Sequence, residues 1–196
     1  MADTWQIYQD TWERHTRQDD PARNGYTAGD IERCKVLMNM VGIQAGRILD
    51  VGCGNGWFRG QRIQDVGIVY IDPSNNITGL DPANENDEDR FPVKHGYGED
   101  IPYDNGTFAA VVARSVLDHV KDHKKVMAEC HRVLQDGGKF YGETAIFAPE
   151  HTQSCHIMSF RFHDIYSELM KHFKTLTGNI IGSDSRYCHF LWEAVK

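Results

Sequence analysis

Three alternating glycines, with an aspartate just before them, are the residues of this sequence best suited to bind a nucleotide. Gly52, Gly54 and Gly56 follow Asp50 at the end of a short apolar run. Glycines let the backbone turn tightly and approach a ligand without an intervening Cβ atom. A dinucleotide-binding turn of the form GxGxxG would place its third glycine where this chain has Trp57. The stretch therefore predicts a strand that ends in a nucleotide-binding turn, and the spacing of its glycines differs from that of a dinucleotide-binding turn.

A second acidic residue is expected to bind the ribose of that nucleotide. The second strand is predicted over Ile68–Ile71, and it ends in Asp72 and Pro73. An ionised aspartate suits the two ribose hydroxyl groups because it offers two acceptor oxygens. A rival run, Ile77 to Asp81, has almost the same pattern nine residues later. We favour Asp72 because it gives ordinary spacing on both sides, whereas the rival leaves a long gap after the glycine turn.

Further stretches downstream of the glycine turn identify a family. Residues 96–108 resemble the motif GDAExLPFxDxSFD, residues 116–120 resemble "vLeHv", and residues 129–140 resemble "EixRVLkpGGxl". With the glycine turn, they make about residues 45–145 resemble class I S-adenosylmethionine-dependent methyltransferases. The resemblance implies S-adenosyl-L-methionine as the cofactor and S-adenosyl-L-homocysteine as the product.

The resemblance also implies which residues contact the cofactor. In the family, the loop after the third strand holds the adenine ring by a backbone amide and an acidic side chain, which here fall to Gly98 and Glu99. Two residues depart from the family pattern: Tyr97 replaces a frequent acid, and Ala109 replaces the usual aspartate. The full set of expected cofactor contacts is Asp50, Gly52, Cys53, Gly54, Trp57, Asp72, Pro73, Gly98, Glu99, Asp100, Arg114 and Ser115.

Few residues are expected to act in the chemical step. A sulfonium cofactor is already an activated electrophile, so alignment of the acceptor atom carries most of the rate. His119 is the best candidate for a general base where the acceptor must lose a proton, although in this family the histidine more often shapes the loop. His151, Cys155 and His156 have irregular spacing without paired CxxC ligands, so we predict no metal site.

The order of apolar runs predicts an α/β protein with a Rossmann-like three-layer sandwich. Alternating strands and helices indicate a mostly parallel, seven-stranded sheet, and two adjacent terminal runs indicate an antiparallel strand pair at its edge. Ligands of such sheets bind outside the carboxyl ends of the strands. Besides those named above, strands are expected near 91–96, 110–113, 139–146, 175–181 and 187–195, and helices near 30–40, 57–65, 123–134 and 164–173.

The 196 residues, 40% of them apolar, are expected to form one domain. We divide it into an N-terminal helical lid or cap (1–44), a cofactor-binding core (45–145) and a substrate-side part (146–196) with a loop, a helix and the terminal strand pair. Residues 1–20 are predicted to form an amphipathic helix, whose Trp5, Tyr8 and Trp12 either pack it on the body or line a lid over the cofactor.

Charge and composition narrow the function. A net charge of −7 without a lysine or arginine run disfavours nucleic acid, and no apolar stretch approaches the roughly 20 residues that span a membrane. Five cysteines without paired spacing favour the reducing cytoplasm. We expect a monomer or homodimer that methylates an O, N, S or C atom of a small molecule. The alternatives are a regulatory or scaffold protein that binds the cofactor without methyl transfer, and an NAD-linked oxidoreductase.

Overall fold

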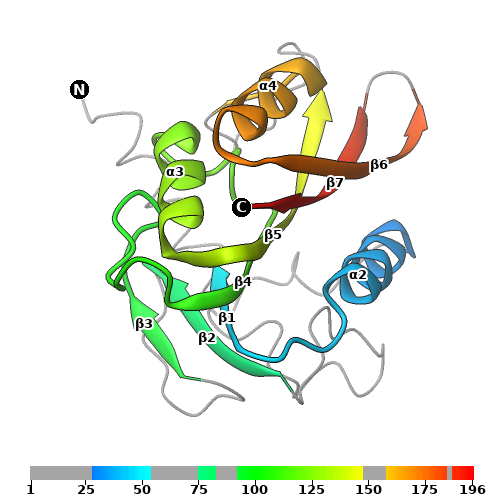
Figure 1. Ribbon diagram of the computed structural model, residues 1–196. Coiled ribbons are helices and arrows are strands. Elements are labelled where there is room, and N and C mark those ends of the chain that lie inside the picture. Colours follow the sequence, from blue (N-terminus) through cyan, green and yellow to red (C-terminus); the bar gives the residue numbers. More distant parts are fainter. Residues whose placement is uncertain (1–27, 54–74, 83–91, 148–157, 185–186) are drawn as a thin grey trace, which may run out of the picture.

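The computed structural model describes residues 28–53, 75–82, 92–147, 158–184 and 187–196 (Figure 1). Seven strands of this part form one sheet in the order β3-β2-β1-β4-β5-β7-β6. The strands are β1 (Arg47–Val51), β2 (Asn76–Asp81), β3 (Val93–His95), β4 (Phe108–Arg114), β5 (Leu134–Phe147), β6 (Thr175–Asp184) and β7 (Tyr187–Val195). The helices are α2 (Ala28–Val41), α3 (His123–Val133) and α4 (Phe162–His172).

Parallel pairing places the carboxyl ends of β1, β2, β3, β4 and β5 at one edge of the sheet. Leu49 of β1 pairs with Thr78 on one side and with Val111 on the other. On the far side, β7 pairs antiparallel with both β5 and β6. The predicted mixed sheet, with its antiparallel strand pair at the edge, is therefore confirmed.

Each face of the sheet is covered by helices, as a three-layer sandwich requires (Figure 1). On one face, α2 buries Cys34, Leu37 and Val41 against Ile48 and Tyr141 of the strands. On the other face, α3 and α4 bury a larger cluster around Phe140 and Trp192. Residues that alternate along each strand supply the two clusters, because successive side chains of a strand point to opposite faces.

The position of β2 corrects the prediction for the second strand. The strand beside β1 is Asn76–Asp81, so the prediction of Ile68–Ile71 at that place is wrong. Its last residue is Asp81, and residues 68–73 lie outside the described residues. The two runs share a local pattern, and only the pairing of β2 with β1 and β3 distinguishes them.

Most other predicted elements lie within a few residues of the observed ones. The pairing of β5 is irregular over residues 135–138, because β4 pairs with Leu134 and then with Lys139 across a register shift, and Gly137 has φ +74°. The helix predicted over 57–65 lies outside the described residues. Among the helices described, none is long and apolar enough to cross a membrane.

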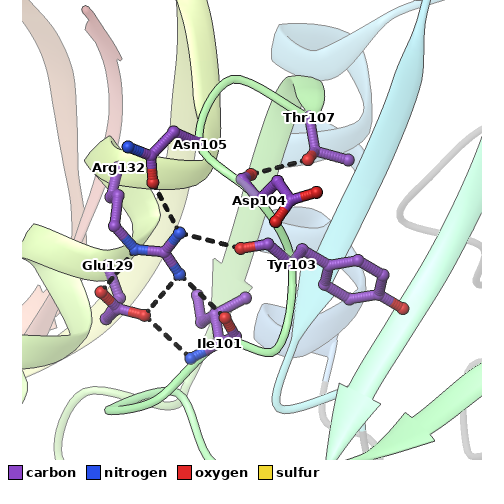
Figure 2. Close-up of polar contacts among 7 residues, drawn as sticks. All are labelled: Ile101, Tyr103, Asp104, Asn105, Thr107, Glu129 and Arg132. Carbon is purple, nitrogen blue, oxygen red and sulfur yellow. Dashed lines mark hydrogen bonds and ion pairs between the residues drawn. The ribbon is translucent and has the colours of Figure 1, made fainter.

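A single arginine on α3 binds the loop that follows β3, as Figure 2 shows. The guanidinium of Arg132 donates to the carbonyl oxygens of Ile101 and Tyr103 and to the side-chain oxygen of Asn105, each over 2.8 Å. It also donates to both carboxylate oxygens of Glu129 over 2.8 Å, and that carboxylate accepts from the backbone N–H of Ile101 over 2.9 Å. We call Arg132, Glu129 and these three loop residues the loop clamp.

The loop clamp explains why the α3 motif needs both a glutamate and an arginine. Hydrogen bonds that involve a charged partner are the stronger ones, and the planar guanidinium can satisfy several acceptors at once. Hydrogen bonding to Arg132, opposed by partial burial, holds the pKa of Glu129 below its ordinary value. The clamp therefore fixes the loop that carries Gly98 and Glu99 onto α3.

We predict that Arg132→Lys lowers the free energy of unfolding by about 2 kcal/mol, because an ammonium group cannot reproduce the guanidinium's hydrogen bonds to the loop. Chemical denaturation followed by circular dichroism measures the change. Arg161→Lys, at an exposed arginine just before α4, is the control and should change stability by less than about 0.5 kcal/mol. Equal effects of the two substitutions would contradict the clamp.

Candidate functional site

The glycine turn begins where β1 ends, between the ends of its two neighbouring strands. Gly52 has φ +67°, a left-handed conformation that favours glycine, and its N–H donates to the carbonyl of Leu80 over 2.7 Å. A Cβ atom at this position would lie 2.4 Å from a methyl carbon of Val116. The turn therefore has room for backbone alone, as a turn that approaches a ligand requires.

Two buried aspartates lie on neighbouring strands next to this turn. Asp50 is in β1 and is 1% exposed, and Asp81 ends β2 and is 2% exposed. Both alternate with residues of the α3 and α4 face, so they lie on the opposite face, which α2 covers. An ionised carboxylate offers two acceptor oxygens, so an aspartate at this edge of the sheet suits hydroxyl or amine donors of a ligand.

The loop after β3 comes close to β1 through its glycine. A Cβ atom on Gly98 would lie 3.2 Å from side-chain carbons of Val51 and Val126, so the loop backbone fits tightly here. The carboxylate of Glu99 accepts from the backbone N–H groups of Lys121 and Asp122 over 2.8 and 3.1 Å. Glu99 thus joins the loop to the segment before α3 through one of its two oxygens. Tyr97 and Asp100 are exposed beside it.

The segment after β4 has a conformation rare for its residue type. Ser115 has φ 50°, the one positive φ of a non-glycine residue in the described part of the chain. Its N–H donates to the backbone carbonyl of Glu143 over 2.8 Å, and its hydroxyl lies 3.2 Å from the Glu143 carboxylate. Backbone of this kind costs energy, so contacts around it must hold it in place.

His119 lies in the same segment, and its surroundings bear on its predicted role. Its backbone N–H donates to the backbone carbonyl of Val116 over 2.9 Å, and its side chain is 12% exposed. Its Nε2 atom is 3.8 Å from a carboxylate oxygen of the buried Asp118. The imidazole is thus beside an acid at the carboxyl edge of the sheet, an arrangement that fits a loop-shaping role as well as proton transfer.

A fully buried glutamate, which the sequence analysis did not select, lies beside Ser115. The carboxylate of Glu143 is 3.1 Å from Nε of Arg33 on α2, 3.2 Å from Nε of Arg114 on β4 and 2.5 Å from Nδ1 of His189 on β7. We call these four residues and Ser115 the Glu143 cluster. It joins a helix and three strands on the α2 face of the sheet.

Two opposing effects set the acidity of Glu143. Burial raises the pKa of its carboxyl group, but contact with His189 and the charges of Arg114 and Arg33 outweigh burial and lower this pKa to about 2. The carboxylate is therefore ionised at any ordinary pH. A buried charge needs such partners, because its desolvation is otherwise unfavourable.

The structure brings together the predicted site residues that lie in the described part of the chain. Asp50, Gly52, Cys53, Gly98, Glu99 and Ser115 are at the carboxyl edge of the sheet, whereas Arg114 directs its guanidinium to Glu143. The predicted residues Gly54, Trp57, Asp72 and Pro73, with His151, Cys155 and His156, lie outside the described residues. A glycine turn, two buried carboxylates and a close loop fit a nucleoside ligand with hydroxyl donors.

Comparisons with known proteins agree with this geometry. Residues 49–142 match the family described as "Methyltransferase domain". Over 111 residues the chain is 33% identical to YrhH, a methyltransferase-like protein of Bacillus subtilis (strain 168), covering 54% of this chain and 62% of that protein. Over 102 residues it is 34% identical to the ubiquinone/menaquinone biosynthesis C-methyltransferase UbiE of Geobacter sp. (strain M21), covering 48% and 43% of the two chains.

Solved structures share the fold. Geranyl diphosphate C-methyltransferase from Streptomyces coelicolor A3(2) aligns over 96% of this chain and 97% of its own, with a TM-score of 0.62 and 14% identity. The chain spans 62% of the length of YrhH and 43% of the length of UbiE. Since the matched stretch contains the glycine turn, the loop after β3 and the α3 motif in the expected order, residues 49–142 form a methyltransferase domain of the class I, S-adenosylmethionine-dependent type.

Proposed function

We propose that this protein transfers a methyl group from S-adenosyl-L-methionine to an O, N, S or C atom of a small molecule. The observation that carries the proposal is the glycine turn at the end of β1, with its positive φ at Gly52, beside the buried carboxylates of Asp50 and Asp81. Family membership supplies the identity of the cofactor. S-adenosyl-L-homocysteine is then the product.

We assign the ribose hydroxyl groups to Asp81. This carboxylate ends the strand beside β1, which is the place where an acid next to the glycine turn can reach a ribose. The assignment to Asp72 depended on a strand over 68–71, and β2 takes that place in the sheet. The backbone of Gly98 and the side chain of Glu99 remain our assignments for the adenine ring. Glu99 keeps one carboxylate oxygen for this contact, because Lys121 and Asp122 engage the other.

The protein's part in the reaction is to bind, orient and exclude water. The bound sulfonium supplies the activated methyl group. The residues around it need to hold the acceptor atom in line behind that group, which is where most of the rate arises. His119 stays our candidate for removing a proton from a protonated acceptor, and its Nε2 atom lies 3.8 Å from a carboxylate oxygen of Asp118.

Several observations support a small acceptor in the cytoplasm. The relative UbiE is named for quinone biosynthesis, and the S. coelicolor enzyme was solved with geranyl diphosphate. The acidic chain lacks a basic run for nucleic acid, and its five cysteines lack paired spacing.

Our prediction of residues 1–44 as a lid changes in one respect. Helix α2 buries three side chains in the sheet core, so a moving lid would be restricted to the residues before α2.

The first test is binding of the cofactor. Calorimetry should detect S-adenosyl-L-methionine and S-adenosyl-L-homocysteine with dissociation constants of roughly micromolar or below, and no NAD. Methyl transfer should then be detectable with labelled cofactor and a panel of quinones, phenols, amines and thiols. NAD binding without binding of the sulfur cofactors would contradict the proposal, and cofactor binding without any transfer would favour the regulatory alternative.

A pair of substitutions separates the two candidate ribose acids. Asp81→Asn should weaken cofactor binding about 5- to 100-fold, because it leaves a ribose hydroxyl without a charged acceptor. Asp72→Asn is the matched control and should leave the dissociation constant unchanged in the same calorimetric titration. The opposite ranking would return the role to Asp72.

Glu143 should make a pH-dependent contribution to stability through the cluster that supports Ser115. Its folded pKa of about 2 is below the ordinary value near 4.3, so its contribution is full above about pH 4.3 and is lost as the pH falls towards 2. Glu143→Gln should therefore cost on the order of 3 kcal/mol at pH 7, and the gap to wild type should narrow below pH 4. Glu32→Gln, exposed on α2, is the control. A gap that stayed constant from pH 7 to 3 would contradict this assignment.

A further inference from the structure

The outer edge of β6 is an edge strand without the usual protection against pairing. In the described part of the chain, β7 is the strand that pairs with β6, and it does so on one side. The strand has no charged residue and no proline from Thr175 to Ser183, and residues 177–180 are exposed. Natural edge strands are commonly shielded by charges, prolines or short length, because their free N–H and C=O groups pair with other chains. A ten-residue strand of this composition is open to such pairing.

The helix beside this edge has an exposed apolar stripe. Phe162, Tyr166 and Met170 of α4 are 39%, 42% and 41% exposed and follow one another at a spacing of four residues. That spacing places them along one side of the helix. The side of α4 that faces α3 is a different side from this stripe, because it carries His172, whose ring lies 6.1 Å from the ring of His131 on α3. The stripe is therefore on the flank of α4 that faces away from α3.

The stripe and the strand edge form one continuous surface. Ile180 of β6 is 60% exposed and is the register partner of Phe190 on β7. The ring of Phe190 lies 4.7 Å from that of Phe162. Leu176, which shares its face of β6 with Ile180, packs against the core cluster that α4 covers. We call Phe162, Tyr166, Met170 and Ile180, with the outer edge of β6, the α4/β6 surface.

We propose that the α4/β6 surface binds a second copy of this chain, with the two β6 strands antiparallel across a two-fold axis. A two-fold interface uses the same surface on both subunits, so that surface must be complementary to itself. Each copy carries a net charge of −7, and residues 175–183 of β6 carry no charge, so two such chains can approach there without repulsion. Antiparallel pairing centred on Asn179 sets position 174, a lysine, opposite position 184 of the other copy, an aspartate.

The pairing extends the sheet from one subunit into the other and places both α4 helices on the same face. With Asn179 at the two-fold axis, Gly178 of each copy pairs with Ile180 of the other. Paired residues of the two copies then point to the same face of the extended sheet. The apolar stripes of the two helices then lie opposite each other above the strands. Burial of these aromatic side chains is the main source of stability, and backbone hydrogen bonds fix the register.

Molar mass in solution tests the proposal. Sedimentation velocity from about 1 to 100 μM should give twice the 22.4 kDa of one chain, with dissociation at the low end. Ile180→Lys and Tyr166→Lys should each shift the dimer to monomer by at least tenfold in dissociation constant while circular dichroism is unchanged. Ile43→Lys is the matched control, since Ile43 is 74% exposed and lies before β1, away from this surface. A monomer at every concentration, or a dimer that only Ile43→Lys disrupts, overturns the proposal.

A cysteine crosslink tests the register. Opposite residues of an antiparallel pair have Cα atoms about 4.5 to 5.5 Å apart, within reach of a disulfide bond. Asn179→Cys should therefore give a covalent dimer on mild oxidation, whereas wild type and Ile43→Cys should not. Thr177→Cys and Ile181→Cys are compared with it in the same assay. If one of these two crosslinks most strongly, the two-fold axis lies at that residue of β6 and the interface is unchanged. A dimer that crosslinks at none of the three positions overturns β6 pairing.

Discussion

The buried carboxylate of Glu143 is the charge on which the arrangement of the α2 face depends. A charge removed from water needs opposite charges and hydrogen bonds at short range. Here the partners come from α2, β4 and β7, so the requirement fixes where the helix docks and how the terminal strands meet the parallel part of the sheet. The same glutamate, through its backbone carbonyl and carboxylate, supports Ser115 in its rare conformation. One desolvated group thus connects the stability of the sheet to the shape of the site.

The parts of the fold that could be predicted are those whose information is local. The strand before Gly52 and the α3 helix have apolar periodicity, glycines and capping residues within a few positions. Asp122 is such a cap, since its side chain accepts from the N–H groups of Lys124 and Lys125. These signals do not depend on which distant residues pack against them, and the family motifs lie at the same positions.

The second strand and the Glu143 cluster could not be predicted for a common physical reason. Two runs that end in aspartate have the same local pattern, and only pairing with β1 and β3 selects Asn76–Asp81. Likewise Glu143 is one acidic residue in an apolar run, and its partner Arg33 is 110 positions away in the sequence. One signal was available in the sequence. Glu143 lies two residues after Tyr141, so it points to the same face of the strand, and an acid that faces a core needs a charged partner.

The strand order at the sheet edge has a consequence for how the chain folds. Within the sheet β6 pairs with β7, which follows it in the sequence, and β7 pairs with β5 on its other side. During synthesis β6 therefore emerges before the strand that holds it, so it cannot join the sheet by itself. The last two strands are expected to form a hairpin and dock on β5 as a unit, in the late, non-local step that limits the folding rate of such topologies. Until the hairpin forms, residues 175–183 are an uncharged, unpaired segment of the nascent chain, which exposes that segment to aggregation or to binding by a chaperone.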